Sequence, residues 1–540
     1  MLPIAEIAEK MGLDPKVMIP QGHYKAKIPL EAIKQGGSRG KLVVVTGITP
    51  TRAGEGKTTI TVGLTQGLGR LGKRVVATLR EPSLGPIFGI KGGGTGGDKA
   101  TVEPQDEINV HFTGDAHAVG SAHNLLAALT DNAVQRQQID GLDPSGVTWR
   151  RVTDVEDRAL RTIISGLGGS ANAPVRETGF DIVTASEVMA LLALSSGLED
   201  LRARLSRIVV GFTNEAKPVT ATDVGAVGSM MSLLRYSIQP NLVQTSEGQP
   251  VLVHTGPFGN IAHGCSSVVA DRLALGYADY VLTEAGFGAD LGFEKFMHIK
   301  ARFNDLEPVA AVLVASVRAL KSHGGVRARE LDSPNEDAVR KGMPNLEHLI
   351  GVVRSFGLPV VVAINRFPTD TKGEIAIVKR GAEAACAHAA VESRVFAEGG
   401  AGGVDLAEAL IDATKGDAPK VRYLYPEEAS TEEKVLALAK KVYNAADVRW
   451  SPAARRQLRV YRDLGWGALP VCMAKTHLSL SHSPSLKGLP SGYTFEVSDV
   501  RASVGAGFIY PVAGTMVTMP GLPGSPRALD VDGAGNILGL

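Results

Sequence analysis

A lysine and two threonines stand directly after a glycine turn, in an arrangement that can hold a polyphosphate. The apolar run at 41–46 predicts a buried strand, and the pattern from Ile60 onward predicts a helix after the turn. Backbone N–H groups of such a turn point into one concavity, the helix N-terminus adds positive potential, and a lysine adds a full charge. The spacing predicts a nucleoside triphosphate site whose candidate ligands are Thr51, Gly54, Glu55, Gly56, Lys57, Thr58 and Thr59.

Two of these residues have distinct roles in the prediction. Lys57 is a candidate catalytic cation, and Thr58 is placed to reach a Mg²⁺ ion that arrives with the nucleotide. Thr51 departs from the usual phosphate-binding loop, which has glycine there. The alternative is an ordinary strand-to-helix turn with a solvated lysine.

A second glycine cluster fills five of the six positions from 92 to 97, and Arg80 and Lys91 flank it. A guanidinium can clamp a phosphate or an acyl phosphate through two hydrogen bonds, so Arg80 is the second candidate catalytic residue. Gly92 and Gly93 belong to the predicted anion loop. Two anion loops, each with a cation, suggest a phosphoryl group that passes between two partners. A flexible linker is the alternative.

Histidines occur near the predicted strand ends. His111 and His117 stand beside Asp115, so this stretch predicts either a metal site or a hydrogen-bonded polar network. His254 and His263 flank a predicted loop at the end of a strand. His111, His254 and His263 are candidate proton shuttles, because the pKa of histidine lies near neutrality. A satisfied core histidine is the alternative.

Two phenylalanines follow predicted strands in the last third of the chain. Phe367 lies in the stretch 365–370, and Phe396 precedes a glycine-rich turn. Two aromatic rings on neighbouring loops form a slot for a planar heterocycle. Phe367 can equally be a plug of the core.

The elements that position these residues form an α/β pattern. Apolar runs alternate with helical patterns, and several runs are apolar on both faces, which is typical of a parallel sheet covered by helices on each side. Because ligands bind beyond the carboxyl ends of such strands, the loops after them should converge on one cleft. The predicted strands are 41–46, 74–79, 207–212, 251–254, 280–283, 309–315 and 358–364.

The chain is too long for one core, so several units are expected. Segments 1–105 and 241–353 are predicted to form a discontinuous nucleotide-binding unit of the P-loop type, with a mainly parallel sheet flanked by helices. The segment 106–240 is predicted to be an inserted helical and α/β unit, in which 154–165 and 187–207 are helical. The segment 354–540 is predicted to be a C-terminal α/β unit that carries both phenylalanines of the predicted slot.

Bulk composition excludes several classes of protein. The net charge is +1, with 57 basic and 56 acidic residues, which speaks against a nucleic-acid partner. No apolar stretch reaches the roughly 18 residues of a membrane span. The three cysteines lack a CxxC spacing, which favours a reducing compartment, so we expect a soluble, cytoplasmic protein.

Long strings of the sequence resemble the formate–tetrahydrofolate ligase family over nearly the whole chain. The strings include AGEGKTT at 53–59, REPSLGP at 80–86, HFTGD at 111–115, NIAHGC at 260–265, TEAGFGADLG at 283–292, NRFPTDT at 365–371 and PVCMAKT at 470–476.

The resemblance implies an ATP-dependent, C–N bond-forming ligase of one-carbon metabolism. Formate and ATP would give formyl phosphate and ADP, and N10 of tetrahydrofolate would take the formyl group to give 10-formyltetrahydrofolate and phosphate. It also implies Mg²⁺ with ATP, a monovalent cation such as K⁺ or NH₄⁺, and a homotetramer. By this likeness Lys57 and Thr58 serve the triphosphate and Mg²⁺, Arg80 and the 92–97 loop hold the formyl phosphate, and Phe367 and Phe396 sandwich the pterin.

The sequence departs from the family near the expected site. Thr49 replaces a usual asparagine, Arg52 a usual proline, and Lys99 a usual tyrosine, within a divergent stretch at 98–105. Phe396 stands where many members have tryptophan. These changes leave open a paralogous ligase on the same scaffold that uses another acceptor amine or another small acid, or an inactive nucleotide-binding subunit.

Overall fold

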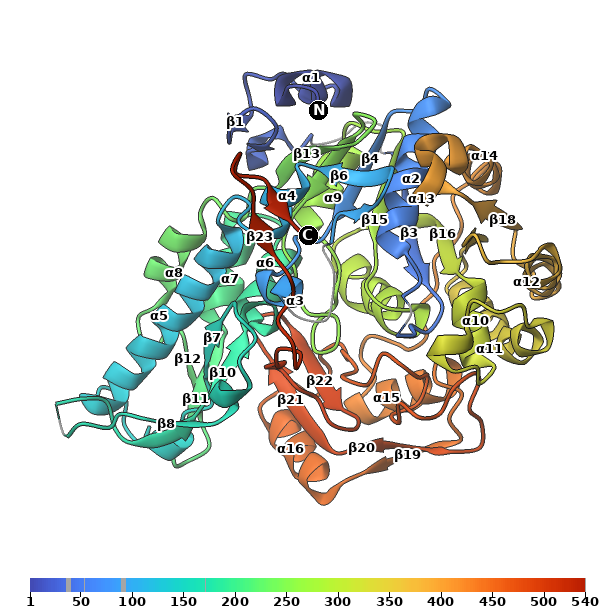
Figure 1. The fold of residues 1–540 in the computed structure, drawn as a ribbon. Coiled ribbons are helices and arrows are strands. Elements are labelled where there is room, and N and C mark those ends of the chain that lie inside the picture. The colour runs from blue at the N-terminus through green and yellow to red at the C-terminus, as the bar shows by residue number, and fades with distance from the viewer. Residues whose placement is uncertain (35–39, 53, 89–93, 170, 540) are drawn as a thin grey trace.

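A single twelve-stranded sheet organises the computed structural model, which describes residues 1–34, 40–52, 54–88, 94–169 and 171–539 (Figure 1). Its strands run in the order β1-β2-β13-β14-β4-β15-β3-β16-β17-β18, with β5 and β6 attached at β13. From β14 to β18 every pair is parallel. The predicted α/β class with a mainly parallel sheet flanked by helices is therefore confirmed.

The parallel strands are β3 (Lys41–Gly47), β4 (Val75–Leu79), β14 (Pro250–Val253), β15 (Tyr280–Glu284), β16 (Pro308–Ala315), β17 (Val360–Asn365) and β18 (Ala389–Ser393). The antiparallel strands at one edge are β1 (Ile19–Pro20), β2 (Ala26–Lys27), β5 (Gly96–Gly97), β6 (Ala100–Glu103) and β13 (Asn241–Thr245).

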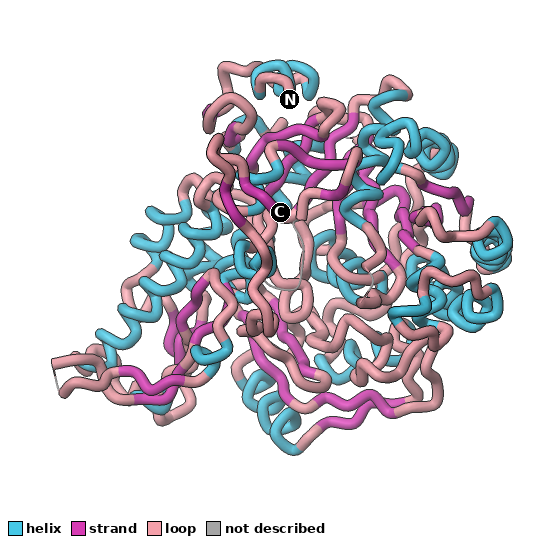
Figure 2. Tube along the Cα trace, viewed as in Figure 1, coloured by secondary structure: helices cyan, strands magenta, loops and turns pink. Residues whose placement is uncertain are grey.

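Both faces of the parallel strands are buried, and β3 shows why the sequence produces this. Val43 and Val45 face one core, and Leu42 and Val44 face another. Side chains alternate between the faces of a strand, so a continuous apolar run needs helices on both sides. Figure 2 shows the strands lying between helices in this way.

One face of the sheet is covered by α2 (Lys57–Arg70), α13 (Val395–Glu398) and α14 (Val404–Ala413), and the other by α1 (Ile4–Met11), α9 (Val268–Leu275), α10 (Val317–His323), α11 (Glu336–Ser355) and α12 (Lys372–Ala384). Two π-helical segments, η5 (Ala289–Phe293) and η6 (Phe296–Ala301), follow β15. The remaining short helices near the sheet are α3 (Leu84–Phe88), α4 (Gln105–Asn109), η1 (Leu30–Ala32), η7 (Ala328–Glu330) and η8 (Gly399–Gly403).

The segment between α4 and β13 forms its own layer, which extends to the lower left in Figure 1. Its strands form three two-stranded sheets that are separate from the large one. Its helices are α5 (Asp115–Gln135), α6 (Glu187–Leu194), α7 (Leu198–Ser206), α8 (Val227–Leu234), η2 (Pro144–Gly146), η3 (Arg158–Arg161) and η4 (Val183–Ala185). Its strands are β7 (Arg151–Thr153), β8 (Ile163–Ser165), β9 (Arg176–Thr178), β10 (Phe180–Ile182), β11 (Val209–Phe212) and β12 (Pro218–Thr220).

One prediction in this layer needs correction. The segment 154–165 is not a helix, because it contains only the short η3 before β8 pairs antiparallel with β9. The β-branched Thr162, Ile163 and Ile164 favour a strand, and this pairing outweighs the weak helical preference of the charged residues before them. The predicted strand 207–212 is confirmed as β11, which pairs with β12 outside the large sheet.

The C-terminal segment lies below the sheet in the view of Figure 1, except for its last part with β23, which runs back up to the middle of the view. It comprises α15 (Thr431–Lys441), α16 (Pro452–Asp463), β19 (Asp447–Trp450), β20 (Thr494–Val497), β21 (Asp499–Ser503), β22 (Phe508–Val512), β23 (Asp530–Val531) and β24 (Ile537–Leu538). The large sheet runs past residue 353, since β17 and β18 belong to it. The division into three units stays a prediction. Within the described residues, no helix is both long enough and apolar enough to span a bilayer.

Candidate active site

The turn between β3 and α2 has the shape of a phosphate-binding loop. Gly56 adopts φ +78°, in the left-handed region that favours glycine, and its N–H lies at the start of α2. A Cβ at Gly56 would lie 2.3 Å from Nδ2 of Asn365, which donates to the carbonyl of Glu55 at 3.0 Å. The last residue of β17 therefore braces the loop, and only glycine fits beneath it.

Lys57 and Glu55 lie together inside this loop. The Lys57 Nζ is 3.9 Å from Oε2 of Glu55, and the Thr51 N–H donates to Oε1 of Glu55 at 2.6 Å. Burial raises the pKa of Glu55 above its usual value, while the charge of Lys57 opposes the rise. At this distance the ammonium is not committed to a short ion pair, so it can bind a phosphate.

Thr58 faces a carboxylate on the next strand of the sheet. Its Oγ1 donates to Oε2 of Glu284 at 2.7 Å. Glu284 ends β15, which pairs directly with β3. A hydroxyl and a carboxylate are hard oxygen ligands of the kind that Mg²⁺ prefers, so this donor pair fits a metal carried by a nucleotide. The described residues contain no group of three or more histidine, cysteine or acidic side chains able to hold a metal.

Arg80 stands at the carboxyl end of β4, on the other side of β15. Its Nη1 donates to the carbonyl of Pro257 at 3.4 Å, and a Cβ at Gly286 would come within 2.8 Å of its Nη2. Glu81 beside it is buried, and burial together with the charge of Asp115 raises its pKa well above the usual value. The guanidinium is held in place while its neighbouring carboxyl favours the neutral form.

A small cavity joins these groups and is called the phosphate cavity below. It measures about 170 Å³, which suits a small anion. It is lined by Thr58, Leu79, Arg80, Glu81, Pro82, Ser83, Ile87, Gly94, Thr184, Gly256, Phe258 and Glu284. Loops after β4, β14 and β15 thus meet the start of α2, and the predicted convergence of strand ends is confirmed.

The second glycine cluster is described only in part. Gly92 and Gly93 lie outside the described residues, and Gly94 lines the phosphate cavity. Asp98 and Lys99 form an exposed turn between β5 and β6, so these divergent side chains face solvent. The Lys99 N–H donates to the carbonyl of Phe396 at 3.2 Å, so this turn holds the second aromatic loop.

Thr49, which replaces the family's usual asparagine, is buried and supports the phosphate-binding loop through hydrogen bonds to other elements. Its hydroxyl accepts from Nδ2 of Asn345 at 3.0 Å, and the same Nδ2 donates to the carbonyl of Gly488 at 3.0 Å. His323 Nε2 lies 2.8 Å from the Thr49 carbonyl. Thr49 therefore joins the phosphate-binding loop to α10, α11 and a C-terminal loop, and it does not line the phosphate cavity.

The two phenylalanines follow adjacent strands: Phe367 lies in the loop after β17, and Phe396 lies on α13 after β18. Asn365 of β17 and Ser393 of β18 are paired in register, and the Arg366 N–H donates to the Ser393 carbonyl at 3.1 Å. Phe367 is half-buried and Phe396 is 53% exposed. We call this pair of rings the aromatic slot.

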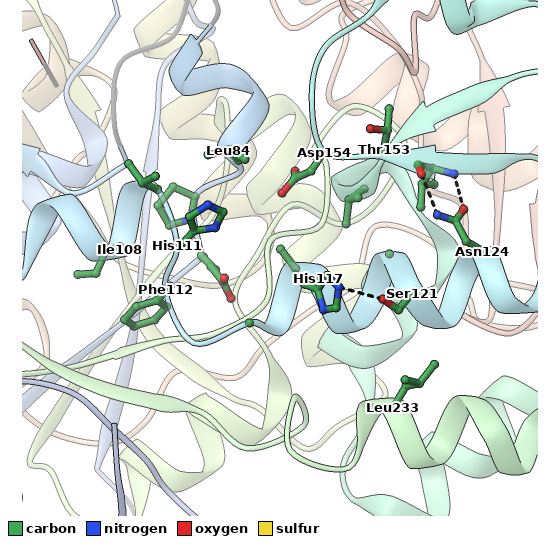
Figure 3. A pocket seen from close by; sticks show the side chains of 18 of the residues that line it. Leu84, Ile108, His111, Phe112, His117, Ser121, Asn124, Thr153, Asp154 and Leu233 are labelled. Atoms are coloured by element: carbon green, nitrogen blue, oxygen red, sulfur yellow. Dashed lines mark hydrogen bonds between the residues drawn. The ribbon is translucent and has the colours of Figure 1, made fainter. Parts of the chain in front are cut away.

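A larger cavity of about 910 Å³ borders the phosphate cavity at Glu81 and Pro82. Figure 3 shows His111 and Asp154 on one side of it, and His117 on α5 beside Ser121. Asp115 does not join these histidines, because its carboxylate forms a buried ion pair with Lys27 at 2.9 Å and accepts from Nδ2 of Asn241 at 2.8 Å. Asp115 therefore belongs to a buried polar network with Lys27 and Asn241 that includes neither His111 nor His117, and the role of these histidines stays a prediction.

His254 and His263 are both buried, but their contacts differ. His254 Nδ1 lies 2.6 Å from the Ser267 hydroxyl and Nε2 lies 2.7 Å from the Ser237 carbonyl, while burial lowers its pKa to about 4. These are the contacts of a neutral core histidine. Neither ring nitrogen of His263 has a hydrogen-bond partner among the described residues, and burial followed by the charge of Lys300 lowers its pKa well below the usual value.

Comparison with known proteins agrees with this geometry. Residues 1–540 match the family described as Formate--tetrahydrofolate ligase. Proteins named Formate--tetrahydrofolate ligase are similar to the chain over its whole length: that of Desulforamulus reducens is 51% identical, with 100% of this chain and 97% of the relative covered, and that of Roseiflexus sp. (strain RS-1) is 53% identical with the same coverage. The protein of that name from Myxococcus xanthus is 50% identical over 99% of this chain and 98% of its own.

The chain belongs to the formate–tetrahydrofolate ligase family.

The structure adds to the candidate site of this ligase two residues that the sequence alone did not single out. Glu284 faces Thr58, and Asn365 braces the phosphate-binding loop. In the sequence, each of these residues appears only as an acidic or amide side chain at the end of an apolar strand. Assigning it to the site requires knowing that β15 pairs with β3 and that β17 lies one strand beyond β16.

Proposed function

We propose that the chain ligates formate to tetrahydrofolate with ATP, and that formyl phosphate is the intermediate. Family membership and the names of the relatives support this reaction. The observation that carries it is the phosphate cavity, which is small, opens onto the phosphate-binding loop at Thr58, and holds Arg80.

The first step needs a phosphoryl group transferred to a weak nucleophile. A carboxylate oxygen of formate attacks the γ-phosphorus of ATP, the bond to the β-phosphate oxygen breaks, and ADP leaves. Lys57 and the N-terminus of α2 bind the phosphates, and Arg80 positions the acceptor oxygen and the phosphoryl group in one small space.

Thr58 and Glu284 would hold the Mg²⁺ that accompanies ATP. When bound there, the ion neutralises charge on the phosphate oxygens. Glu284 also accepts the Thr58 hydroxyl hydrogen, which orients the oxygen lone pairs of Thr58 toward the loop.

The second step uses the mixed anhydride. N10 of tetrahydrofolate attacks the formyl carbon, the carbon–oxygen bond to phosphate breaks, and the N10 proton is released and ends on the departing phosphate, so hydrogen phosphate leaves. Arg80 binds the departing phosphate. Burial and the charge of Asp115 raise the pKa of the neighbouring Glu81, which shifts this carboxyl toward its neutral form.

The aromatic slot is proposed to hold the pterin between Phe367 and Phe396. Support comes from the pairing of the two strands that they follow and from the exposure of Phe396. Among the three histidines, His111 is the one open to solvent and stays a candidate proton shuttle. Dependence on K⁺ or NH₄⁺, a homotetramer and a cytoplasmic location stay predictions from the family likeness.

A paralogous ligase with another acceptor has little support. Of the divergent positions, Thr49 is a buried brace, while Asp98 and Lys99 face solvent. None of them lines the phosphate cavity.

The test is turnover of the purified chain with ATP, formate and tetrahydrofolate. We expect 10-formyltetrahydrofolate, measured after acid cyclisation by methenyl absorbance, and transfer of ¹⁸O from formate to inorganic phosphate. Product formation without label in phosphate would exclude formyl phosphate. Absence of product at saturating substrates, with ATP still bound, would favour a different acceptor or an inactive subunit.

A further inference from the structure

A cavity of about 510 Å³ lies where the layer of α5 to α8 meets the C-terminal strands β21 and β22, and we call it the interlayer cavity. It shares no lining residue with the phosphate cavity. Its volume falls within the range of roughly 300–1,000 Å³ that is usual for small-molecule sites. Phenylalanine, tyrosine and tryptophan side chains form much of its wall: Trp149, Phe212, Tyr461, Trp466, Phe508 and Tyr510.

Two guanidinium groups line the interlayer cavity, and each is already neutralised by a carboxylate. Nη1 of Arg150 lies 3.1 Å from Oδ1 of Asp181, and Nε of Arg501 donates to Oδ2 of Asp499 at 3.1 Å. His123, which also lines the cavity, is neutral because burial lowers its pKa to about 3. An anionic ligand therefore finds no uncompensated positive charge in this wall.

Glu187 is the carboxylate of the cavity that lacks such a partner. It is the first residue of α6, it is half-buried, and its Oε1 accepts from the N–H of Ala506 at 3.1 Å. In the part of the chain that the structure describes, no cationic side chain lies within ion-pair distance of Glu187. Burial raises its pKa to about 7, although hydrogen bonds and the more distant charge of Arg207 oppose the rise. A cation bound beside Glu187 would stabilise the charged carboxylate.

The aromatic wall favours a cation that carries apolar groups. Trp466 is half-buried, and its ring centroid lies 5.5 Å from that of Tyr461 at an angle of 40°. Trp149 is already stacked on His123, with ring centroids 4.2 Å apart, so Trp466 is the better placed of the two indoles. The face of an aromatic ring attracts a cation, and tryptophan does so most strongly. A bare inorganic ion would leave the apolar wall uncovered, and a neutral ligand would leave Glu187 unpaired.

We propose that the interlayer cavity binds a small organic ammonium ion, with Glu187 pairing its charge and Trp466 covering its alkyl groups. One uncompensated carboxylate matches one positive charge on the ligand. This site is separate from the proposed reaction, and its test does not depend on turnover.

The test is a titration of tryptophan fluorescence with choline, a quaternary ammonium ion, and with 3,3-dimethylbutan-1-ol, its uncharged isostere. The chain has three tryptophans, of which Trp149 and Trp466 line the cavity and Trp450 does not. We expect a saturable change with choline and a Kd roughly tenfold lower than that of the isostere, because the carboxylate and the ring faces favour the charged ligand. Ammonium chloride at the same ionic strength should give no saturable change.

Glu187→Gln keeps an acceptor for the Ala506 N–H and removes the charge. It should raise the Kd of choline roughly tenfold and leave that of the isostere unchanged. Trp466→Leu removes the ring face and should also weaken choline binding, which is then followed by calorimetry. Trp450→Phe is the matched control and should leave both Kd values unchanged. Thermal unfolding of each variant shows whether the fold is retained.

Equal affinities for choline and the isostere in the wild type would show that charge plays no part, and would overturn the proposal. A response to choline that does not saturate would overturn it as well. So would wild-type choline affinity in folded Glu187→Gln. If that variant does not fold, unchanged choline binding in Trp466→Leu is the result that refutes the site.

Discussion

Lys57→Ala should abolish most turnover while leaving the fold intact. The ammonium contributes charge stabilisation where the γ-phosphoryl group is transferred, and removal of one such preorganised group costs about 10²–10³ in kcat, or roughly 3–4 kcal/mol. We expect the upper end, because Lys57 is the first residue of α2, where its charge adds to the positive potential of the helix N-terminus.

The structural contacts of Lys57 explain why stability should change little. Its ammonium is 3.9 Å from Glu55, beyond a hydrogen bond. Burial raises the pKa of Glu55 and the charge of Lys57 opposes the rise, so removing Lys57 raises this pKa further and shifts the buried carboxyl toward its neutral form. The free energy of unfolding should fall by only about 1 kcal/mol.

The assay is product formation by methenyl absorbance, with thermal unfolding measured in parallel. Lys73→Ala is the control, since Lys73 is exposed just beyond the far end of α2 and should change neither quantity. Lys57→Arg keeps the charge but has a different geometry, and should restore part of the rate. Turnover of Lys57→Ala within tenfold of the wild type would falsify the assignment of Lys57 to phosphoryl transfer.

Three further predictions follow from other contacts. Thr58→Val should lower kcat by about 10²-fold and raise the Mg²⁺ concentration that gives half-maximal rate. Thr58→Ser keeps the hydroxyl and should restore both quantities. An equal loss of activity in the two variants would contradict a role of Thr58 as a Mg²⁺ ligand. Phe396→Ala should raise the folate KM about two- to tenfold and the ATP KM less, because ring stacking contributes about 0.5–1.5 kcal/mol. Phe396→Trp should lower the folate KM. Equal shifts of the KM for both substrates would refute the role of the aromatic slot in folate binding. Burial raises the pKa of Glu187 to about 7 from a usual 4.5, so its neutral form is favoured in the folded state and stability should fall as pH rises from 4.5 to 7, by at most about 3 kcal/mol. Glu187→Gln should flatten this part of the stability curve, measured by denaturant unfolding, and an unchanged slope refutes the assignment.

The parallel sheet could be predicted because the sequence pattern that indicates each of its strands lies within one short stretch of the chain. Runs such as 309–315 are apolar on both faces, and this pattern has few other uses in a chain of this length. The segment 154–165 was predicted wrongly for the opposite reason, since its strand β8 exists only through pairing with β9.

The candidate site could be predicted where chemistry and spacing coincide in one stretch. Lys57, Thr58 and Arg80 lie in such stretches, and the structure places them around one cavity or its adjoining loop. Glu284 could not be ranked from sequence, because its value comes from strand order. Separating His254 from His263 required their hydrogen-bond partners, which lie on other elements.

The phosphate-binding loop is made early in synthesis, yet the residues that hold its shape are made late. Thr49 depends on Asn345, Glu55 depends on Asn365, and Asn345 is itself tied to Gly488. A nascent chain that has emerged only as far as α10 carries every residue of the loop without its supports. ATP should therefore not bind to N-terminal fragments, and nucleotide cannot stabilise the growing chain before nearly all of it has left the ribosome.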